Sequence, residues 1–130
     1  MKLARAFAEE LGTKYAVVDK RRVDAKQVES DALIGDVDNK DVILVDDICS
    51  TGETLGKALR ICKAAGAKKI FAVVTHGLFV REAFKESAIE KMLITNTVDL
   101  QSEDDVVETV SVAPLFAQAI RETSRTLFPC

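Results

Sequence analysis

Two short segments of the chain are apolar on both faces of an extended strand, and they constrain the fold more than any other feature. They are DVILVD at residues 41–46 and KIFAVVTHG at residues 69–77. Such strands are typical of a parallel sheet that is covered on both faces. Between them, residues 54–65 carry apolar side chains at helical spacing, and Gly66 follows. The sequence therefore predicts a strand, a helix and a second strand parallel to the first.

The rest of the chain extends this alternation of strands and helices. We expect further strands at 15–19, 91–97 and 106–112, and helices at 1–11, at 81–88 and from Pro114 to about Arg125. The polar segments 20–31 and 101–105 are expected to be loops, the first of them mobile. The predicted fold class is α/β, a parallel sheet with helices on both faces, in a single domain that spans residues 1–130.

Composition excludes several classes of protein. The chain of 130 residues is 48% hydrophobic and 30% charged, as expected of a soluble globular domain, and its net charge of −3 argues against a nucleic-acid surface. No apolar run is long enough for a membrane span, and the charged N-terminal helix is not a signal peptide. Cys49, Cys62 and Cys130 lie far apart, so we expect free thiols in the cytoplasm and no metal held by protein ligands.

The strongest candidate site follows the first doubly apolar strand. Asp46 and Asp47 stand where that strand ends, and a run of small polar residues then leads into the helix. In open α/β sheets, ligands bind beyond the carboxyl ends of the strands. Carboxylates accept hydrogen bonds from hydroxyl groups, whereas a helix N-terminus with a glycine nearby suits a phosphate. A ribose 5-phosphate has a diol at one end and a phosphate at the other, so it fits both halves of the segment.

A simpler interpretation needs no ligand. Ser50 and Glu53 have the spacing of a capping box, and aspartate is common where strands end. Capping does not account for a second carboxylate, nor for Thr51 and Thr54 on either side of Gly52. We therefore favour the ligand site.

These residues also carry a family resemblance. VILVDDICSTGET, at residues 42–54, resembles the phosphoribosyl-binding signature of the type I phosphoribosyltransferases. Together with it, four further segments resemble, in the same order, parts of the carboxy-terminal half of the ribose-phosphate diphosphokinases (phosphoribosyl diphosphate synthetases). These segments are VVDKRR (17–22), VTHGLF (74–79), LITNT (93–97) and VSVAPLFAQAI (110–120). The resemblance runs through nearly the whole chain, and five ordered segments make it specific.

The resemblance implies a reaction and roles for residues. ATP would transfer its β,γ-diphosphoryl group to the 1-hydroxyl of ribose 5-phosphate, with Mg²⁺ as the cofactor. Asp46 and Asp47 would hold the ribose hydroxyls, and Lys20 and Arg22 would close over the transferred phosphates as catalytic residues. Without the resemblance, the basic segment 20–22 would be interpreted as a solvated turn. The residues that would hold the 5-phosphate are Ser50, Thr51, Gly52 and Thr54.

Four other residues near the predicted site have plainer interpretations. We expect His76 to be a hydrogen-bonded structural residue, because the sugar hydroxyl is the nucleophile in the implied reaction. Cys49 has no histidine partner in the sequence around it and is expected to be a small filler. Asn96 is expected to bond backbone groups. Glu53 stands where the family often has glycine, which suits a helix N-terminus but not a phosphate unless its side chain points to solvent.

The sequence leaves three functions open. The first is a ribose-phosphate diphosphokinase or its carboxy-terminal domain, and the second is a non-catalytic ribose-phosphate-binding module or regulatory subunit. The third is a different phosphoribosyltransferase, which ranks last because no segment offers a base-recognition hood. The family's amino-terminal half, with its ATP contacts, does not match any part of the chain. We therefore expect a homo-oligomer, or docking to such a half through an exposed edge or apolar face of the sheet.

Overall fold

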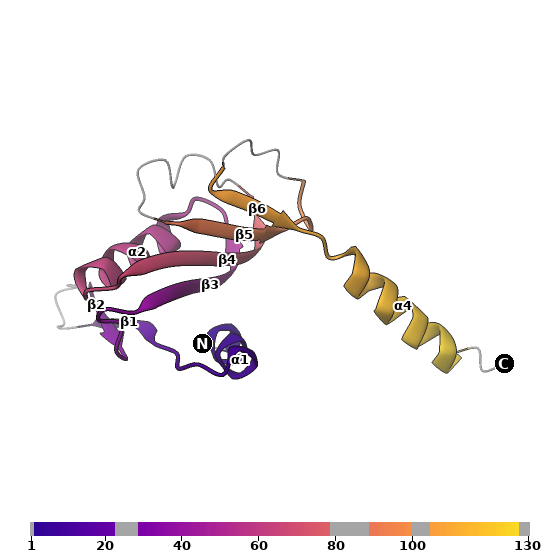
Figure 1. The fold of residues 1–130 in the computed structure, drawn as a ribbon, viewed down its shortest axis with the longest axis horizontal. Coiled ribbons are helices and arrows are strands. Elements are labelled where there is room, and N and C mark those ends of the chain that lie inside the picture. The colour runs from indigo at the N-terminus through magenta and orange to yellow at the C-terminus, as the bar shows by residue number, and fades with distance from the viewer. Residues whose placement is uncertain (1, 23–28, 79–88, 100–104, 128–130) are drawn as a thin grey trace.

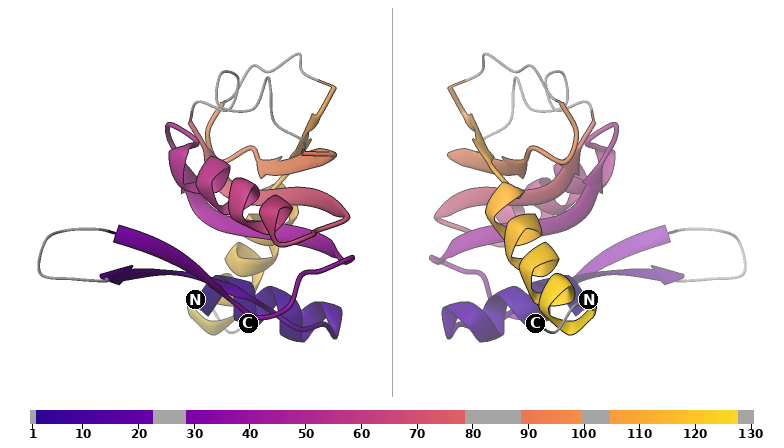
Figure 2. Two further views of the ribbon diagram at one scale, coloured as in Figure 1. Left: turned by 90° about the vertical axis from the view of Figure 1, so that its left-hand side faces the viewer. Right: turned by 90° about the vertical axis from the view of Figure 1, so that its right-hand side faces the viewer.

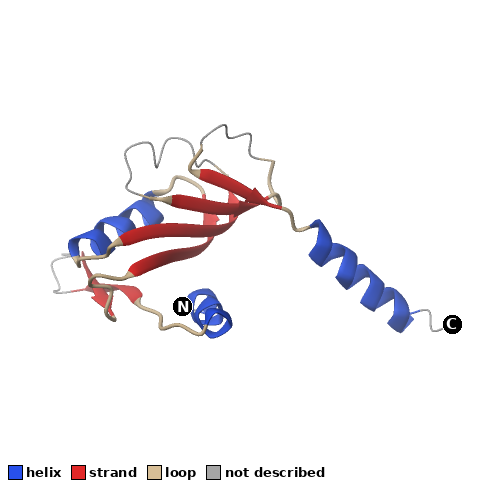
Figure 3. Ribbon diagram, in the orientation of Figure 1, coloured by secondary structure: helices blue, strands red, loops and turns tan. Residues whose placement is uncertain are grey.

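The centre of the molecule is a parallel sheet of four strands in the order β3-β4-β5-β6 (Figure 1). The computed structural model describes residues 2–22, 29–78, 89–99 and 105–127. Secondary structure is coloured in Figure 3. The strands of the sheet are β3 (Asp41–Cys49), β4 (Lys69–Gly77), β5 (Lys91–Thr95) and β6 (Val107–Val110). The helices among the described residues are α1 (Lys2–Leu11), α2 (Glu53–Ala64) and α4 (Ala113–Leu127).

The doubly apolar segments form two neighbouring parallel strands, β3 at an edge of this sheet and β4 inside it. β3 and β4 pair in parallel with Leu44 opposite Ala72, and β4 pairs with β5 with Ala72 opposite Met92. Parallel neighbours need a crossover connection, and α2 supplies it between β3 and β4. The predicted strand–helix–strand unit is therefore confirmed.

One face of the sheet packs against α2 and forms the core. Because side chains alternate along a strand, every second residue points to this face. The helix contributes residues about one turn apart, so that its buried side chains form a single stripe. The core residues of α2 are Leu55, Leu59 and Cys62, and those of the sheet include Leu44, Ile70, Ala72, Val74, Met92 and Ile94.

α1 lies on the opposite side of the sheet, away from α2, and contacts β3 (Figure 2). Residues 81–88, predicted to be a helix, lie outside the described residues. The fold is thus α/β with a parallel sheet and helices on both sides, as predicted. α4 projects away from the body of the molecule (Figure 1).

The prediction that residues 20–31 form a loop is wrong at 20–22 and 29–31, which lie in strands, and residues 23–28 lie outside the described part of the structure. β1 (Val17–Arg22) pairs antiparallel with β2 (Glu29–Ile34) in a separate two-stranded sheet, and the predicted strand at 15–19 therefore begins and ends later than expected. The register places Val17 opposite Ile34 and Arg22 opposite Glu29. The sequence does contain a hairpin signal, namely the apolar ends VV and ALI and the oppositely charged runs KRR and ESD. We did not recognise this signal because the charged runs are as polar as a loop.

Other predicted bounds differ by a few residues. β3 continues three residues past the predicted end at Asp46, and β6 is shorter than predicted but is an edge strand, as expected. α4 begins at Ala113, one residue before Pro114. Of the predicted acidic loop at 101–105, only Asp105 lies within the described residues.

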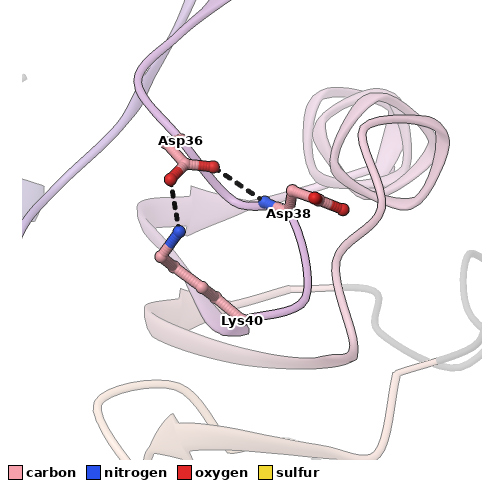
Figure 4. A network of polar contacts seen from close by, with 3 residues as sticks. All are labelled: Asp36, Asp38 and Lys40. Carbon is pink, nitrogen blue, oxygen red and sulfur yellow. Dashed lines mark hydrogen bonds and ion pairs between the residues drawn. The ribbon is translucent and has the colours of Figure 1, made fainter.

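A polar turn fixes the chain where it enters β3 (Figure 4). The Asp36 carboxylate accepts a hydrogen bond from the Asp38 backbone N–H at 3.1 Å and forms an ion pair with Lys40. This ion pair and the hydrogen bonds lower the pKa of Asp36. The Asn39 N–H donates to the Gly66 carbonyl at 2.8 Å, which ties the turn to the end of α2. At the end of the sheet where β3 and β4 begin, the two segments that lead into these strands are therefore hydrogen-bonded to each other.

Replacing Gly35 with alanine should destabilise the fold at the base of the hairpin. Gly35 has φ of 124°, and a Cβ there would lie 2.7 Å from the Ala16 Cβ and 3.0 Å from its Cα. We expect Gly35→Ala to lower the free energy of unfolding by about 2–3 kcal/mol, through backbone strain and overlap together. Gly12→Ala is the matched control, because Gly12 has φ of 61° but nothing within 4 Å of an added Cβ. Urea unfolding of both variants measures the difference, and equal losses would contradict the predicted overlap.

Candidate functional site

The loop between β3 and α2 is shaped by a glycine in a left-handed conformation. β3 ends at Cys49 and α2 begins at Glu53, so three residues make the connection. Gly52 has φ of 75° and is the cap residue of α2, and its carbonyl accepts a 2.7 Å hydrogen bond from the Gly56 N–H. A residue with a Cβ adopts this conformation only at a cost of roughly 1–2 kcal/mol. Glycine therefore allows the tight turn from the strand into the helix.

The capping-box interpretation of this loop is wrong. The cap residue of α2 is Gly52 rather than Ser50, and no side-chain hydrogen bond caps it. The only side-chain contact described near this helix start is a long hydrogen bond of 3.4 Å from the Glu53 N–H to the Thr51 hydroxyl. Because backbone N–H groups at a helix N-terminus attract anions, this end of α2 suits a phosphate. The Glu53 side chain is exposed in the first turn.

The two acids occupy different environments on β3. Asp46 is half-buried and Asp47 is exposed. The Asp46 Oδ1 accepts a hydrogen bond from the Asp47 N–H, and the Asp47 Oδ1 accepts one from the Ile48 N–H, each at 2.9 Å. Burial raises the pKa of the Asp46 carboxyl, and the adjacent Asp47 carboxylate raises it further, against the lowering effect of the Asp47 N–H.

The predicted loop residues line one small pocket, and an open groove adjoins it at Asp46. The pocket has a volume of about 30 Å³, and the groove, between α1 and the end of β3, has a volume of about 690 Å³. Both are lined by Asp46, whereas Asp47 lines only the groove. The residues lining the pocket are Asp46, Ile48, Cys49, Ser50, Thr51, Gly52, Glu53, Thr54 and Leu55.

The two predicted catalytic cations lie on the hairpin rather than in a loop. Lys20 and Arg22 are in β1, opposite Asp31 and Glu29 of β2. Their side chains lie outside the described part of the structure. The structure therefore places the backbone of these residues on a separate two-stranded sheet, and their approach to the acids stays a prediction.

A set of hydroxyl groups at the ends of β4 and β5 was missed in the sequence. The His76 Nδ1 lies 2.8 Å from the Thr97 hydroxyl, which also lies 2.8 Å from the Thr95 hydroxyl. Both threonines donate to the Thr75 carbonyl, at 2.7 Å and 3.1 Å. His76 is thus hydrogen-bonded, as predicted. Threonines on either side of a strand end were the signal that could have revealed this network.

Asn96 and Cys49 also match their predicted roles. The Asn96 side-chain oxygen accepts a hydrogen bond from the Val112 N–H at 2.9 Å, so it bonds backbone. Cys49 is 3% exposed, and burial, with the charge of Asp46 as a second cause, raises the pKa of its thiol. A thiol held protonated in this way is a packing residue and a poor nucleophile.

Two classes of site are not found among the described residues. In the ranges that the structure describes, no three His, Cys, Asp or Glu side chains come together in a way that could hold a metal ion. No described helix is both long and apolar enough to cross a membrane.

Comparison with known proteins identifies the family. The sequence profile of the phosphoribosyl synthetase-associated domain matches residues 13–126, which is most of the chain. The chain belongs to this family. The match includes the hairpin, the sheet and nearly all of α4, so the phosphoribosyl synthetase-associated domain corresponds to the whole described fold apart from α1.

Relatives of this phosphoribosyl synthetase-associated domain are much longer proteins. A ribose-phosphate pyrophosphokinase of Wolinella succinogenes is 42% identical over 121 residues, which are 91% of this chain and 39% of the relative. The ribose-phosphate pyrophosphokinase 2 of Schizosaccharomyces pombe is 40% identical over 126 residues, again 39% of its length. The chain thus spans about two-fifths of the relatives that it matches.

A solved structure supports the fold of the domain. The phosphoribosylpyrophosphate synthetase of Mycobacterium smegmatis superimposes with a TM-score of 0.81 at 29% identity, over 94% of this chain and 41% of that one. The fold of this chain is therefore similar to that of the part of the synthetase that it covers.

Proposed function

We propose that this chain is the ribose 5-phosphate-binding domain of a ribose-phosphate pyrophosphokinase. The observation that carries the proposal is the loop after β3, where two carboxylates adjoin a helix N-terminus that no side chain caps. The names of the relatives support the choice of substrates, ribose 5-phosphate and ATP. The product would be phosphoribosyl diphosphate for nucleotide biosynthesis. Free, buried cysteines such as Cys49 and Cys62 suit the reducing cytoplasm.

The proposed binding mode divides the sugar phosphate between two parts of the loop. The Asp46 and Asp47 carboxylates accept hydrogen bonds from the ribose hydroxyls. The 5-phosphate lies at the N-terminus of α2, where the helix dipole and backbone N–H groups favour a negative charge. The pocket of about 30 Å³ is smaller than a whole sugar phosphate, so the ribose extends into the groove that Asp46 also lines. The residues that hold the phosphate are Ser50, Thr51, Gly52 and Thr54.

The catalytic part of the proposal concerns the hairpin. Negative charge builds up on the transferring oxygens of the diphosphoryl group, and cations aimed at them lower the barrier. Lys20 and Arg22 supply such cations if the hairpin closes over the substrate. Closure must be a movement of paired strands and not the ordering of a loop, since both residues lie in β1.

Phosphate oxygens of the substrates, more than protein side chains, would bind Mg²⁺ at this site. Mg²⁺ usually takes only one or two protein carboxylates together with phosphate oxygens, and Asp46 and Asp47 offer no more than that. When bound, the ion would neutralise charge on the phosphates of ATP. The residues of this chain would then bind and orient the sugar.

A second candidate is a binding module without turnover. The chain covers only 39% of the ribose-phosphate pyrophosphokinases that it matches, so any residues that turnover requires from the rest of those proteins would be missing from the matched part. In that case the chain would bind ribose 5-phosphate and act as a subunit or sensor.

Release of AMP from ATP and ribose 5-phosphate separates the two candidates. If the chain is catalytic, we expect AMP in a coupled assay, and Lys20→Ala should reduce its rate by about 10³-fold or more because one transition-state cation is lost. Arg21→Ala is the control, since Arg21 lies between the two proposed catalytic residues and should retain most activity. Calorimetric binding of ribose 5-phosphate without AMP release would favour the module. Neither binding nor release would reject both.

A further inference from the structure

His76 is the only histidine of the chain, and its ring is hydrogen-bonded on one side. It lies at the carboxyl end of β4, the end of a parallel strand where α/β sheets bind their ligands. The Nδ1 atom contacts the Thr97 hydroxyl at 2.8 Å. The part of the chain that the structure describes offers no hydrogen-bond partner to Nε2. The half-buried ring therefore has one nitrogen held by the protein and one left for solvent or a ligand.

The number of protons in the network shows which ring nitrogen of His76 is protonated. Short contacts join the His76 Nδ1 to the Thr97 hydroxyl at 2.8 Å, and that hydroxyl to the Thr95 hydroxyl at 2.8 Å. A third contact joins the Thr95 hydroxyl to the Thr75 carbonyl at 2.7 Å. Each contact needs one proton, and the two hydroxyl groups supply only two. The third proton must therefore be on Nδ1, which leaves Nε2 unprotonated in the neutral ring.

The opposite tautomer would leave one of these contacts without a proton. With Nδ1 unprotonated, the Thr97 hydroxyl would donate to it and would no longer donate to Thr95 or Thr75. The single Thr95 proton would then have to serve both remaining contacts, at 2.8 Å and 2.7 Å. Two oxygen atoms at such a distance are favourable only with a hydrogen between them. In the favoured arrangement, the Thr97 proton is shared between the Thr95 oxygen and the Thr75 carbonyl, which is 3.1 Å away.

The strand register places His76 beside the candidate site. His76 lies opposite Ile48 of β3, and Gly77 lies opposite Cys49. Ile48 and Cys49 both line the small pocket. Asp46 precedes Ile48 by two residues, so a rise of about 3.3 Å per residue and a strand spacing of about 4.8 Å put its Cα about 8 Å from that of His76. A small ligand at the ends of these two strands can therefore reach both side chains.

We propose that His76 is a further ligand-binding residue, whose Nε2 accepts a hydrogen bond from a hydroxyl group of the bound sugar. An unprotonated imidazole nitrogen accepts from hydroxyl groups, whereas phosphate oxygens are themselves acceptors. His76 therefore acts with Asp46 at the sugar end of the ligand. Thr97 is a positioning residue, because it acts only through the ring. The inference rests on the proposed function, since it takes ribose 5-phosphate as the ligand.

Nitrogen-15 NMR of the ring tests the tautomer before any ligand is added. We expect a protonated Nδ1 and an unprotonated Nε2 at about pH 8.5, where an ordinary imidazole is neutral. The tag-free chain contains one histidine, so the ring signals have a single assignment. An unprotonated Nδ1 beside a protonated Nε2 would overturn the inference whatever the chain binds.

The same spectrum, recorded with ligand, tests the hydrogen bond to the sugar. Ribose 5-phosphate should shift the Nε2 signal, and inorganic phosphate alone at the same concentration should not. Calorimetry on the same sample measures whether the sugar phosphate binds. Binding with an unshifted Nε2 would overturn this inference and leave the proposed function standing, as would protonation of Nε2 on binding, which would place the ring at the phosphate. No binding at all would reject the proposed function and this inference with it.

Two substitutions of His76 separate its two nitrogens. His76→Asn keeps an amide N–H near the position of Nδ1, so it can still donate to Thr97, but it has no acceptor at the position of Nε2. Its affinity for ribose 5-phosphate should fall by about 3–10-fold, the value of one neutral hydrogen bond. His76→Gln can place an oxygen near the position of Nε2 and should retain more of the affinity. Wild-type affinity in His76→Asn, with the fold intact by circular dichroism, would contradict the proposed contact.

Substitutions of Thr97 test the orientation of the ring. Thr97→Val removes the acceptor for Nδ1, so both tautomers should become populated and the affinity should fall by about 3-fold. Thr97→Ser keeps the hydroxyl and should restore both the tautomer and the affinity. A purely structural role of Thr97 would change the stability of the fold and leave the tautomer of His76 as it was, and that result would overturn the positioning role.

Discussion

The double variant Asp46→Asn, Asp47→Asn should lose at least about 100-fold in affinity for ribose 5-phosphate, because two charge-assisted hydrogen bonds of roughly 1.5–3 kcal/mol each are removed. The fold should remain intact. Each Asn side chain keeps an oxygen that can accept the backbone N–H now bonded to the carboxylate, at 2.9 Å in both cases. Isothermal calorimetry measures the affinity, and circular dichroism checks the fold. Unchanged affinity would remove the proposed role of the two acids.

The same substitution at Asp46 should have a pH-dependent effect on stability. Its pKa in the folded chain is raised above the ordinary value of 3.8, mainly by burial. A carboxyl with a raised pKa destabilises the fold as pH rises from the unfolded pKa through the folded pKa, because the charged form is disfavoured. Asp46→Asn should therefore be at least as stable as the wild type at neutral pH, and the difference should vanish below pH 3.8. A site that weakens the fold in return for binding is a common compromise.

Leu59→Ala should be the most destabilising single substitution in the core, with a loss of about 3–4 kcal/mol in the free energy of unfolding. Leu59 lies on the buried stripe of α2 and is 5% exposed. Truncating it opens a cavity between α2 and the fully buried Ala72 and Val74 of β4. Chemical denaturation measures the loss.

The matched control for this core substitution is Leu11→Ala. Leu11 is also helical but is 58% exposed, so its loss should be below about 0.5 kcal/mol. Similar losses for the two variants would mean that α2 does not pack on the sheet as described.

Periodicity predicted the parts of the fold whose burial is uniform. β4 has the predicted bounds, 69–77, because its residues are apolar on both faces. α2 spans residues 53–64 instead of the predicted 54–65, so it begins and ends one residue earlier than predicted. The hairpin was not predicted, since its strands are polar and lie outside the main sheet. Pairing between distant segments, and not local propensity, decides such strands.

The loop after β3 was predicted with its residues but not with its geometry. Sequence spacing did not decide between a cap at Ser50, which gives a helix from Thr51, and a cap at Gly52, which gives a helix from Glu53. The φ of 75° at Gly52 decides between them. The network of Thr95, Thr97 and His76 depends on the register of β4 and β5, which the sequence does not specify.

The two ends of the sheet, where the strands begin and where they end, differ in how well their loops should tolerate replacement. At the amino-terminal edge, the turn at residues 36–40 is tied across the chain, with the Asn39 N–H bonded to the Gly66 carbonyl and the Lys68 N–H bonded to the Lys40 carbonyl. The strand ends there are locked without help from the opposite edge. Segments at the carboxyl edge can therefore be exchanged without loss of topology. Grafting other loops after Cys49, where β3 ends, should redirect this scaffold to sugars or anions of different shape, with its architecture preserved.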